Sequence, residues 1–190
     1  MLKKDIRKAY RHKREQLDKL RLPMLEDMIL ENFKRLELPK LQMIHRYMPA
    51  QGMHEPDPGP LCEWLSFLNP GMTQVLPRVD MLSNEMSGII INGRTELVMN
   101  KWGIPEPSEG NEADPESIDL VLIPLLAFDL SGHRVGYGKG FYDRFLRNCR
   151  PDCIKAGLSF FGPVESIDDL NVFDRKMDLC ITPERVYEFQ

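Results

Sequence analysis

The stretch 119–145 constrains the fold of this chain most strongly, because it passes from an apolar run to a glycine-rich loop and then to an amphipathic segment. It begins with an apolar run at 120–124, which is typical of a strand buried in a parallel sheet. The loop 125–135 leads to three glycines at alternate positions, and an amphipathic helix is predicted from Phe141 onward. A strand, a glycine-rich loop and a helix in this order present backbone N–H groups to a phosphate.

Charged side chains lie in and around this glycine loop. Lys139 stands between two of the glycines, Arg134 precedes them, and Asp143 follows within one turn. A lysine flanked by glycines has little to pack against, so we expect Lys139 to hold phosphate and Asp143 to hold a metal ion. The glycine spacing does not match the dinucleotide-binding fingerprint G-x-G-x-x-G. It also does not match the phosphate loop G-x-x-x-x-G-K-[ST] of nucleoside triphosphatases. On the glycines alone, an ordinary tight turn therefore remains an alternative.

Strands and helices alternate along the rest of the chain. Strands are predicted at 41–48, 73–79, 88–92, 96–100, 120–124, 154–160 and 178–182, and helices at 3–20, between Pro23 and Pro39, and at 61–68. This order indicates one α/β domain over residues 1–190, a three-layer α/β/α sandwich with a mainly parallel, mixed sheet of the Rossmann-like type. Ligands of such sheets bind beyond the carboxyl ends of the strands, where the glycine loop lies.

Two segments of the middle region carry local signals. Asn92-Gly93 predicts a hairpin that joins the strand 88–92 to the strand 96–100 as an antiparallel addition. The segment 105–119 contains three prolines and six carboxylates but no basic residue, so we expect a solvated, mobile loop.

Basic residues are concentrated at the N-terminus. Nine of the first 21 residues are Lys or Arg in a chain whose net charge is −4, and Lys3, Arg7, Arg11 and Arg14 recur at helical spacing. Such a stripe fits either an anion that docks on this helix or an ordinary solvated face.

Composition excludes several classes of partner. The acidic net charge gives no indication of a nucleic-acid binder, and the longest apolar run, nine residues interrupted by Pro124, is too short to span a bilayer. The N-terminus is charged and lacks the apolar core of a signal peptide. The four cysteines and four histidines match no zinc spacing. We therefore expect a cytoplasmic monomer with reduced thiols and small-molecule substrates, without nucleic-acid or membrane partners.

The string R-V-G-Y-G-K-G-F-Y-D at 134–143 resembles the signature of the 5-formyltetrahydrofolate cyclo-ligases, also called 5,10-methenyltetrahydrofolate synthetases. Other segments resemble the family in the same order: K-K-D-I-R at 3–7, R-Y-M-P at 46–49, E-P-D-P-G-P-L at 55–61, N-K-W-G-I-P-E-P at 100–107 and F-D-R-K-M-D-L-C-I-T-P at 173–183. Phe173 departs from the pattern, because many members have histidine before the aspartate that aligns with Asp174.

The resemblance implies an enzyme that uses ATP as co-substrate and Mg²⁺ to cyclise 5-formyltetrahydrofolate to 5,10-methenyltetrahydrofolate, with release of ADP and phosphate. It implies catalytic roles for Lys139 and Arg134, and metal binding by Asp143 and Asp174. The implied ATP-binding residues are Lys3, Arg7, Arg134, Val135, Gly136, Tyr137, Gly138, Lys139, Gly140, Phe141 and Tyr142. The implied folate-binding residues are Met48, Glu55, Tyr137, Gly138, Lys139, Gly140 and Phe141.

Two other functions remain open at this point. A phosphate loop on an α/β scaffold also suits an enzyme that acts on a phosphorylated sugar or an acyl-CoA, since a fold does not fix a function. A homologue that binds nucleotide or folate without turnover is the other alternative. It would be stabilised by its ligand but would form no product.

Overall fold

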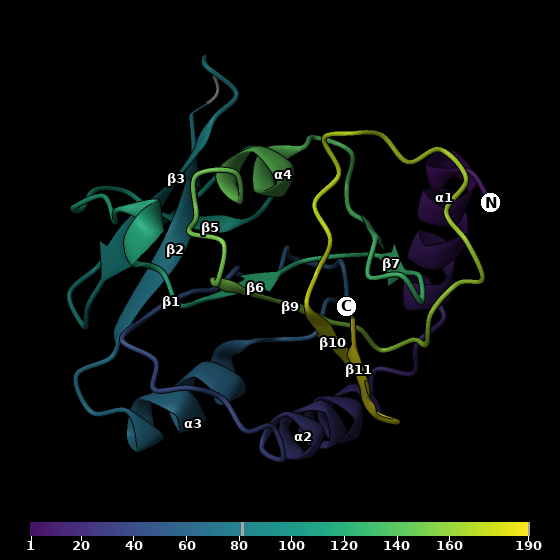
Figure 1. The fold of residues 1–190 in the computed structure, drawn as a ribbon, viewed down its shortest axis with the longest axis horizontal. Coiled ribbons are helices and arrows are strands. Elements are labelled where there is room, and N and C mark those ends of the chain that lie inside the picture. The colour runs from purple at the N-terminus through teal and green to yellow at the C-terminus, as the bar shows by residue number, and fades with distance from the viewer. Residues whose placement is uncertain (81, 190) are drawn as a thin grey trace.

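The computed structural model describes residues 1–80 and 82–189, and a seven-stranded sheet runs through its centre (Figure 1). The strand order is β11-β10-β9-β6-β1-β2-β3. The strands are β1 (Met43–His45), β2 (Thr73–Val79), β3 (Met86–Ile91), β6 (Leu120–Ile123), β9 (Ile154–Leu158), β10 (Leu179–Ile181) and β11 (Val186–Glu188). The neighbours from β10 to β2 pair in parallel, whereas β3 and β11 add antiparallel at the two edges.

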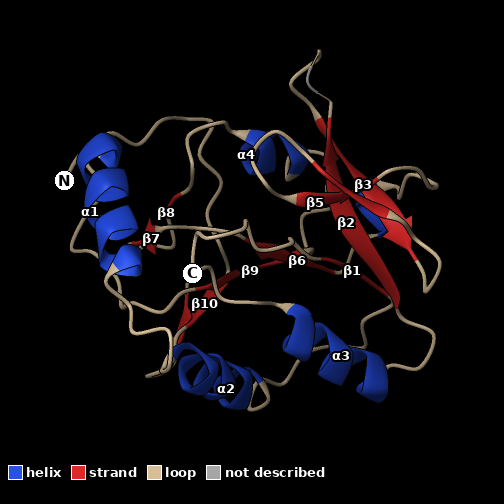
Figure 2. Ribbon diagram, turned by 180° about the vertical axis from the view of Figure 1, so that it is seen from behind, coloured by secondary structure: helices blue, strands red, loops and turns tan. Residues whose placement is uncertain are grey.

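Helices lie on both sides of this sheet, which confirms the predicted α/β class with a mixed, mainly parallel sheet. Figures 1 and 2 show α2 (Leu22–Phe33) and α3 (Gly59–Leu68) on one side and α4 (Phe141–Phe145) on the other. The helix α1 (Lys3–Glu15) packs beside the small hairpin of β7 (Ala127–Phe128) and β8 (Arg134–Val135). None of the helices in the described ranges is long and apolar enough to cross a membrane.

The central strand β6 explains why the apolar run at 120–124 dominates the sequence pattern. All four of its side chains are buried, and they alternate between two cores. Leu120 and Leu122 pack in the core under α2 and α3, and Val121 and Ile123 pack in the core that contains Phe145 of α4. A strand covered on both faces is apolar at every position, as the sequence indicated.

The first helix is shorter than predicted. It ends at Glu15, five residues before the expected end, and Leu20, the last residue of the predicted helix, is 90% exposed. Ile6 and Tyr10 are buried in a third core together with Val135. Beyond Glu15 only Leu17 packs, half-buried, against the core under α2 and α3, whereas Leu20 does not, and helical stability in proteins comes mainly from such packing.

The predicted hairpin at Asn92-Gly93 is wrong. Asn92 does begin a turn, in which the N–H of Thr95 donates to the Asn92 carbonyl at 3.0 Å, but β3 does not pair with β4 (Leu97–Met99). β4 instead pairs with β5 (Pro105–Pro107) in a separate two-stranded sheet. The place beside β3 is taken by a later segment, in which Ile90 donates to Asn111 at 2.9 Å and Ala113 donates to Gly88 at 2.8 Å.

The same contacts correct the prediction of a solvated loop at 105–119. This segment contains β5, the bridge between Ile89 and Glu112, and a short 3₁₀-helix, η1 (Pro115–Ser117). Four of its side chains are buried: Glu106, Pro107, Ala113 and Ile118. Edge strands of sheets leave backbone groups that another segment can satisfy, and here an acidic segment does so for β3.

Candidate active site

A cavity of about 390 Å³ lies where the chain leaves β6, and Pro124, the residue after that strand, lines it. The structure gathers nearly all the predicted site residues here. They are Lys3, Arg7, Met48, Glu55, Arg134, Gly136, Tyr137, Gly138, Lys139, Gly140, Phe141, Tyr142, Asp143 and Asp174. Val135 is the exception, because its side chain is buried in the core with Ile6 and Tyr10. Position beyond a carboxyl strand end agrees with the general rule for such sheets.

The glycine loop presents backbone donors to the cavity. Among the described residues, no N–H group from 136 to 140 donates a hydrogen bond within the protein. Gly138 has a φ of 89°, and a Cβ there would lie 3.3 Å from the guanidinium carbon of Arg7. The Nε of Arg7 donates to the carbonyl of Gly136 at 3.0 Å. The loop is therefore held by α1 while its donors stay available.

The helix that follows the loop differs from the expected one. α4 has only five residues, with Gly140 in the left-handed conformation at its N-cap. Because so short a helix has only a small macrodipole, an anion here would be held by the loop N–H groups and by side chains. Lys139 is exposed at the cavity, as expected of a lysine between glycines.

Two carboxylates and two cations meet at one end of the cavity. Nη2 of Arg134 donates to Oδ1 of Asp143 at 2.8 Å, and Nζ of Lys3 donates to Oδ2 of Asp174 at 2.5 Å. Burial acts to raise the pKa of Asp174, but the hydrogen bonds from Lys3 and from the backbone N–H of Asn171 outweigh it, so this pKa is lowered. Burial lowers the pKa of Arg134, while Asp143 acts to raise it.

The two aspartates at this end of the cavity are partly engaged by protein hydrogen bonds. Residues 1–80 and 82–189 contain no group of three or more His, Cys, Asp or Glu side chains placed so that they could hold a metal ion together. Asp143 uses Oδ1 for Arg134 and for the N–H of Arg175, and Asp174 uses Oδ2 for Lys3 and Asn171. Each carboxylate keeps its other oxygen, and Mg²⁺ typically takes one or two carboxylates and completes its shell with phosphate and water.

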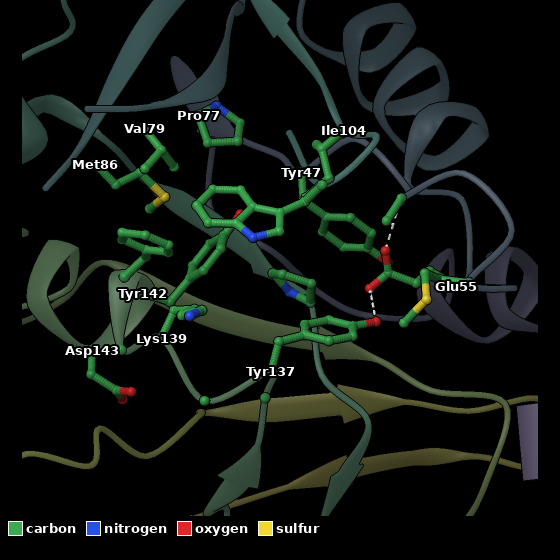
Figure 3. Close-up of a pocket in the computed structure, with 18 of the residues that line it drawn as sticks. Tyr47, Glu55, Pro77, Val79, Met86, Ile104, Tyr137, Lys139, Tyr142 and Asp143 are labelled. Atoms are coloured by element: carbon green, nitrogen blue, oxygen red, sulfur yellow. Dashed lines mark hydrogen bonds between the residues drawn. The ribbon is translucent and has the colours of Figure 1, made fainter. Parts of the chain in front are cut away.

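Glu55 lies towards the other end of the cavity from Asp143 and Lys139, as Figure 3 shows. Its Oε1 accepts a hydrogen bond from the Tyr137 hydroxyl at 2.6 Å, and its Oε2 accepts one from the N–H of Ala50 at 2.8 Å. Arg14 completes this group from α1: its Nη1 donates to the Tyr137 hydroxyl at 2.8 Å and lies 3.7 Å from Oε1 of Glu55. Three segments distant in sequence thus fix the Glu55 carboxylate.

Aromatic and aliphatic side chains form the walls between the two ends. The ring centroids of Trp102 and Phe141 are 5.8 Å apart, and Pro77, Val79 and Met86 line the wall above Tyr142 (Figure 3). Apolar walls with a few fixed polar groups are typical of sites for small organic ligands.

Sequence reasoning missed several residues of the cavity, including Arg11, Asn100 and Glu106. Arg11 belongs to the helical stripe of basic residues, so the spacing along α1 could have identified it. Asn100 and Glu106 lie in the segment 100–107 that resembles the family, but they were given no role, and 105–119 was interpreted as a solvated loop.

Fold and cavity together define a small α/β protein with a glycine-rich loop that lines a cavity at the carboxyl edge of its sheet. Residues 2–182 match the model of the 5-formyltetrahydrofolate cyclo-ligase family. The chain belongs to this family, which confirms the resemblance seen in its motifs.

Curated relatives match over shorter segments. A 5-formyltetrahydrofolate cyclo-ligase of Mycoplasma genitalium is 42% identical over 72 residues, which cover 37% of this chain and 42% of that protein. The enzyme of that name from Escherichia coli K12 is 34% identical over 100 residues, which cover 50% of this chain and 54% of that protein. The chain thus spans about half the length of these relatives.

Solved structures match over the whole chain. The NMR structure of a 5,10-methenyltetrahydrofolate synthetase from Aquifex aeolicus has a TM-score of 0.81 at 31% identity, and the match covers 100% of this chain and 94% of that one. A 5,10-methenyltetrahydrofolate synthetase from Mycoplasma pneumoniae has a TM-score of 0.76 at 26% identity, with 96% and 99% covered.

Proposed function

We propose that this chain cyclises 5-formyltetrahydrofolate to 5,10-methenyltetrahydrofolate, with ATP as co-substrate and with release of ADP and phosphate. The observation that carries the proposal is the division of one cavity into two chemically different ends. One end offers unpaired N–H groups, Lys139 and two carboxylates, and the other offers apolar walls and a fixed carboxylate. Relatives named for this reaction support the same conclusion.

The loop end suits the triphosphate. Phosphoryl transfer depends mainly on positioning and on neutralising charge, which N–H groups of 136–140 and the ammonium of Lys139 would provide. Arg7 would act close by, because its guanidinium already lies against Gly138. Arg134 is buried and engaged with Asp143 and with the carbonyl of Arg175, so its geometry favours holding Asp143 in place over direct contact with phosphate.

Mg²⁺ fits the aspartate pair by the chemistry of its donors. Asp143 and Asp174 supply hard oxygen ligands at the phosphate end, and the few carboxylates here suit an ion that keeps water and phosphate in its shell. When bound, the ion would neutralise charge on the triphosphate oxygens. Lys3 and Arg134 compensate these carboxylates in the protein alone, so we expect both ion pairs to loosen when the metal and nucleotide bind.

The reaction needs activation because a formamide carbonyl is a poor electrophile. Transfer of the γ-phosphoryl group to the formyl oxygen would make that oxygen a good leaving group. N10 of the folate would then attack the formyl carbon, and phosphate would depart as the ring closes. The walls near Trp102, Phe141 and Met48 would hold the folate so that its formyl group faces Lys139.

The test is a spectrophotometric assay. Purified protein is mixed with 5-formyltetrahydrofolate, ATP and Mg²⁺, and the near-ultraviolet absorbance of the methenyl product is followed. We expect a rise that needs ATP and is abolished by a chelator and restored by added Mg²⁺. A flat trace from folded protein would contradict the proposal. Ligand-dependent melting with ATP and with folate would then test for a binding protein without turnover.

We propose further that the protein works in the cytoplasm as a monomer on these small molecules, without a nucleic-acid or membrane partner. The monomer is checked by light scattering at micromolar concentration. A dimer under these conditions would contradict it.

A further inference from the structure

Glu106 is a carboxylate at the cavity that the proposed function leaves unused. It is only 7% exposed, yet it lines the cavity from β5. Its Oε1 accepts a hydrogen bond from Nδ2 of Asn100 at 2.8 Å, and the backbone of Val79 contributes a second contact. It forms no ion pair with any residue in the described ranges. An ionised carboxylate has about four acceptor sites, so Glu106 is buried with part of its capacity unmet.

The side chain of Asn100, which donates to Glu106, is itself held in one orientation by hydrogen bonds. Oδ1 of Asn100 accepts hydrogen bonds from the N–H groups of Trp102 at 2.9 Å and Ile104 at 3.1 Å. The backbone N–H of Asn100 donates to the Ile104 carbonyl at 2.9 Å. These contacts fix which way the amide faces, so its Nδ2 must point to Glu106. Outer contacts of this kind orient groups that meet a ligand.

A second polar group at the cavity also lacks a partner. The hydroxyl of Tyr142 is buried and forms no hydrogen bond with any part of the chain that the structure describes. Burial raises the pKa of Tyr142, and the carboxylates of Glu55 and Glu106 act in the same direction. Buried polar groups are rarely left unpaired, so an unpaired hydroxyl and a carboxylate with spare acceptor sites on one cavity indicate a ligand that carries polar groups.

The contrast with Glu55 decides which carboxylate remains available. Both oxygens of Glu55 accept hydrogen bonds from the protein, and Arg14 compensates its charge at 3.7 Å. Glu106 has no cation within ion-pair distance among residues 1–80 and 82–189; burial raises its pKa, and the hydrogen bonds from Asn100 and the Val79 backbone and the charge of Arg78 act to lower it. One side-chain donor and one backbone donor thus reach each carboxylate, and the difference is that Arg14 lies within ion-pair distance of Glu55, whereas no cation of the described residues does so for Glu106.

We propose that Glu106 is a specificity-determining residue that accepts hydrogen bonds from the N–H groups of the pterin ring, with Asn100 as its positioning residue. The inference rests on the proposed function, since it concerns the reduced folate. The pterin carries a ring N–H and an exocyclic amino group side by side, and a carboxylate accepts such a pair with two oxygens. In this arrangement the role of Glu55 is to hold Tyr137 in place through the hydrogen bond from the Tyr137 hydroxyl.

The test measures binding without turnover. Calorimetric titration with 5-formyltetrahydrofolate, without ATP, compares the wild type with Glu106→Gln and with Glu109→Gln, an exposed carboxylate of the same segment. Glutamine can keep the contact with Asn100 but then turns its amide donors towards the ring N–H groups. We expect the Kd for the folate to rise at least about tenfold in Glu106→Gln only. The Kd for ATP should stay within twofold of wild type in both variants.

A folate analogue without the 2-amino group makes the test specific. This analogue keeps the ring N–H but lacks the amino group, so its Kd should rise clearly less from wild type to Glu106→Gln than the Kd of 5-formyltetrahydrofolate does. An equal rise in Kd for both ligands would overturn the assigned contact, and so would unchanged folate binding in a folded Glu106→Gln. If Glu106→Gln does not fold, Glu106→Asp, which shortens the side chain by one methylene, answers the same question.

Failure of this inference is distinguishable from failure of the proposed function. A wild-type protein that forms the methenyl product, while Glu106→Gln binds folate normally, overturns the role of Glu106 alone. A wild-type protein that binds no reduced folate overturns both.

Discussion

Acidification should destabilise the fold through His45, a histidine with 0% exposure in β1. Its ring packs against Phe145, with centroids 4.9 Å apart, and against Tyr142 at 5.8 Å. Apart from a contact with its own backbone, its ring nitrogens have no hydrogen-bond partner in the part of the chain that the structure describes. Burial lowers the pKa of His45 from 6.5 to about 3.

The magnitude follows from linkage between protonation and folding. In the unfolded chain the ring takes up a proton near pH 6.5, whereas in the folded protein it stays neutral down to about pH 3. The contribution of the neutral ring to stability is therefore complete above pH 6.5 and is lost as the pH falls towards 3. The loss in the free energy of unfolding is about 2 kcal/mol between pH 7 and pH 5, and about 4 kcal/mol by pH 3.

Urea unfolding at pH 7 and at pH 5 measures this loss, for wild type, His45→Phe and the control His12→Gln. His12 lies on α1 with its side chain 70% exposed. Wild type and His12→Gln should each lose about 2 kcal/mol more than His45→Phe over this interval. Equal losses in all three proteins would refute the reasoning. His45→Leu replaces the phenylalanine variant if the larger ring does not fit.

The remaining predictions concern catalysis and packing. Lys139→Ala and Asp143→Asn should each lower the turnover number for methenyl formation at least about a hundredfold with unchanged circular dichroism, and near-normal turnover would remove that residue from the mechanism. Arg7→Ala should raise the KM for ATP well above that of the Lys8→Ala control, and equal values would leave Arg7 as a surface charge. Gly88→Ala should lower the free energy of unfolding by about 1–3 kcal/mol, because its Cβ would lie 2.6 Å from Cγ1 of Val75; an unchanged urea midpoint would contradict this.

The sequence predicted those parts of the structure that local pattern determines. The apolar run of β6 and the glycines around Lys139 are short, strong signals, and each lies where it was expected. The course of the chain after Asn92 depended on which segment would occupy the edge of β3, a competition between distant segments that no local pattern reveals.

Glu106 was missed for a related reason. The prolines and carboxylates around Glu106 in the sequence are typical of exposed loops. Glu106 is buried because β5 pairs with β4 and packs on β2. The motif at 100–107 includes Glu106, but only the fold shows that its carboxylate is buried at the cavity. Val135 shows the opposite case, because it belongs to the motif but serves the core.

The dependence of α1 on late parts of the chain has a consequence during synthesis. Lys3 and Asp174 are separated by 171 residues, and Arg7 and Gly136 by 129. The helix is synthesised well before these partners, and Ile6 and Tyr10 can be buried only after Leu126 and Val135 have been made. Until then an apolar and strongly basic segment is open to chaperones or to misassembly. The proposed nucleotide site would accordingly be complete in a nascent chain only after Gly136 and Asp174 have emerged.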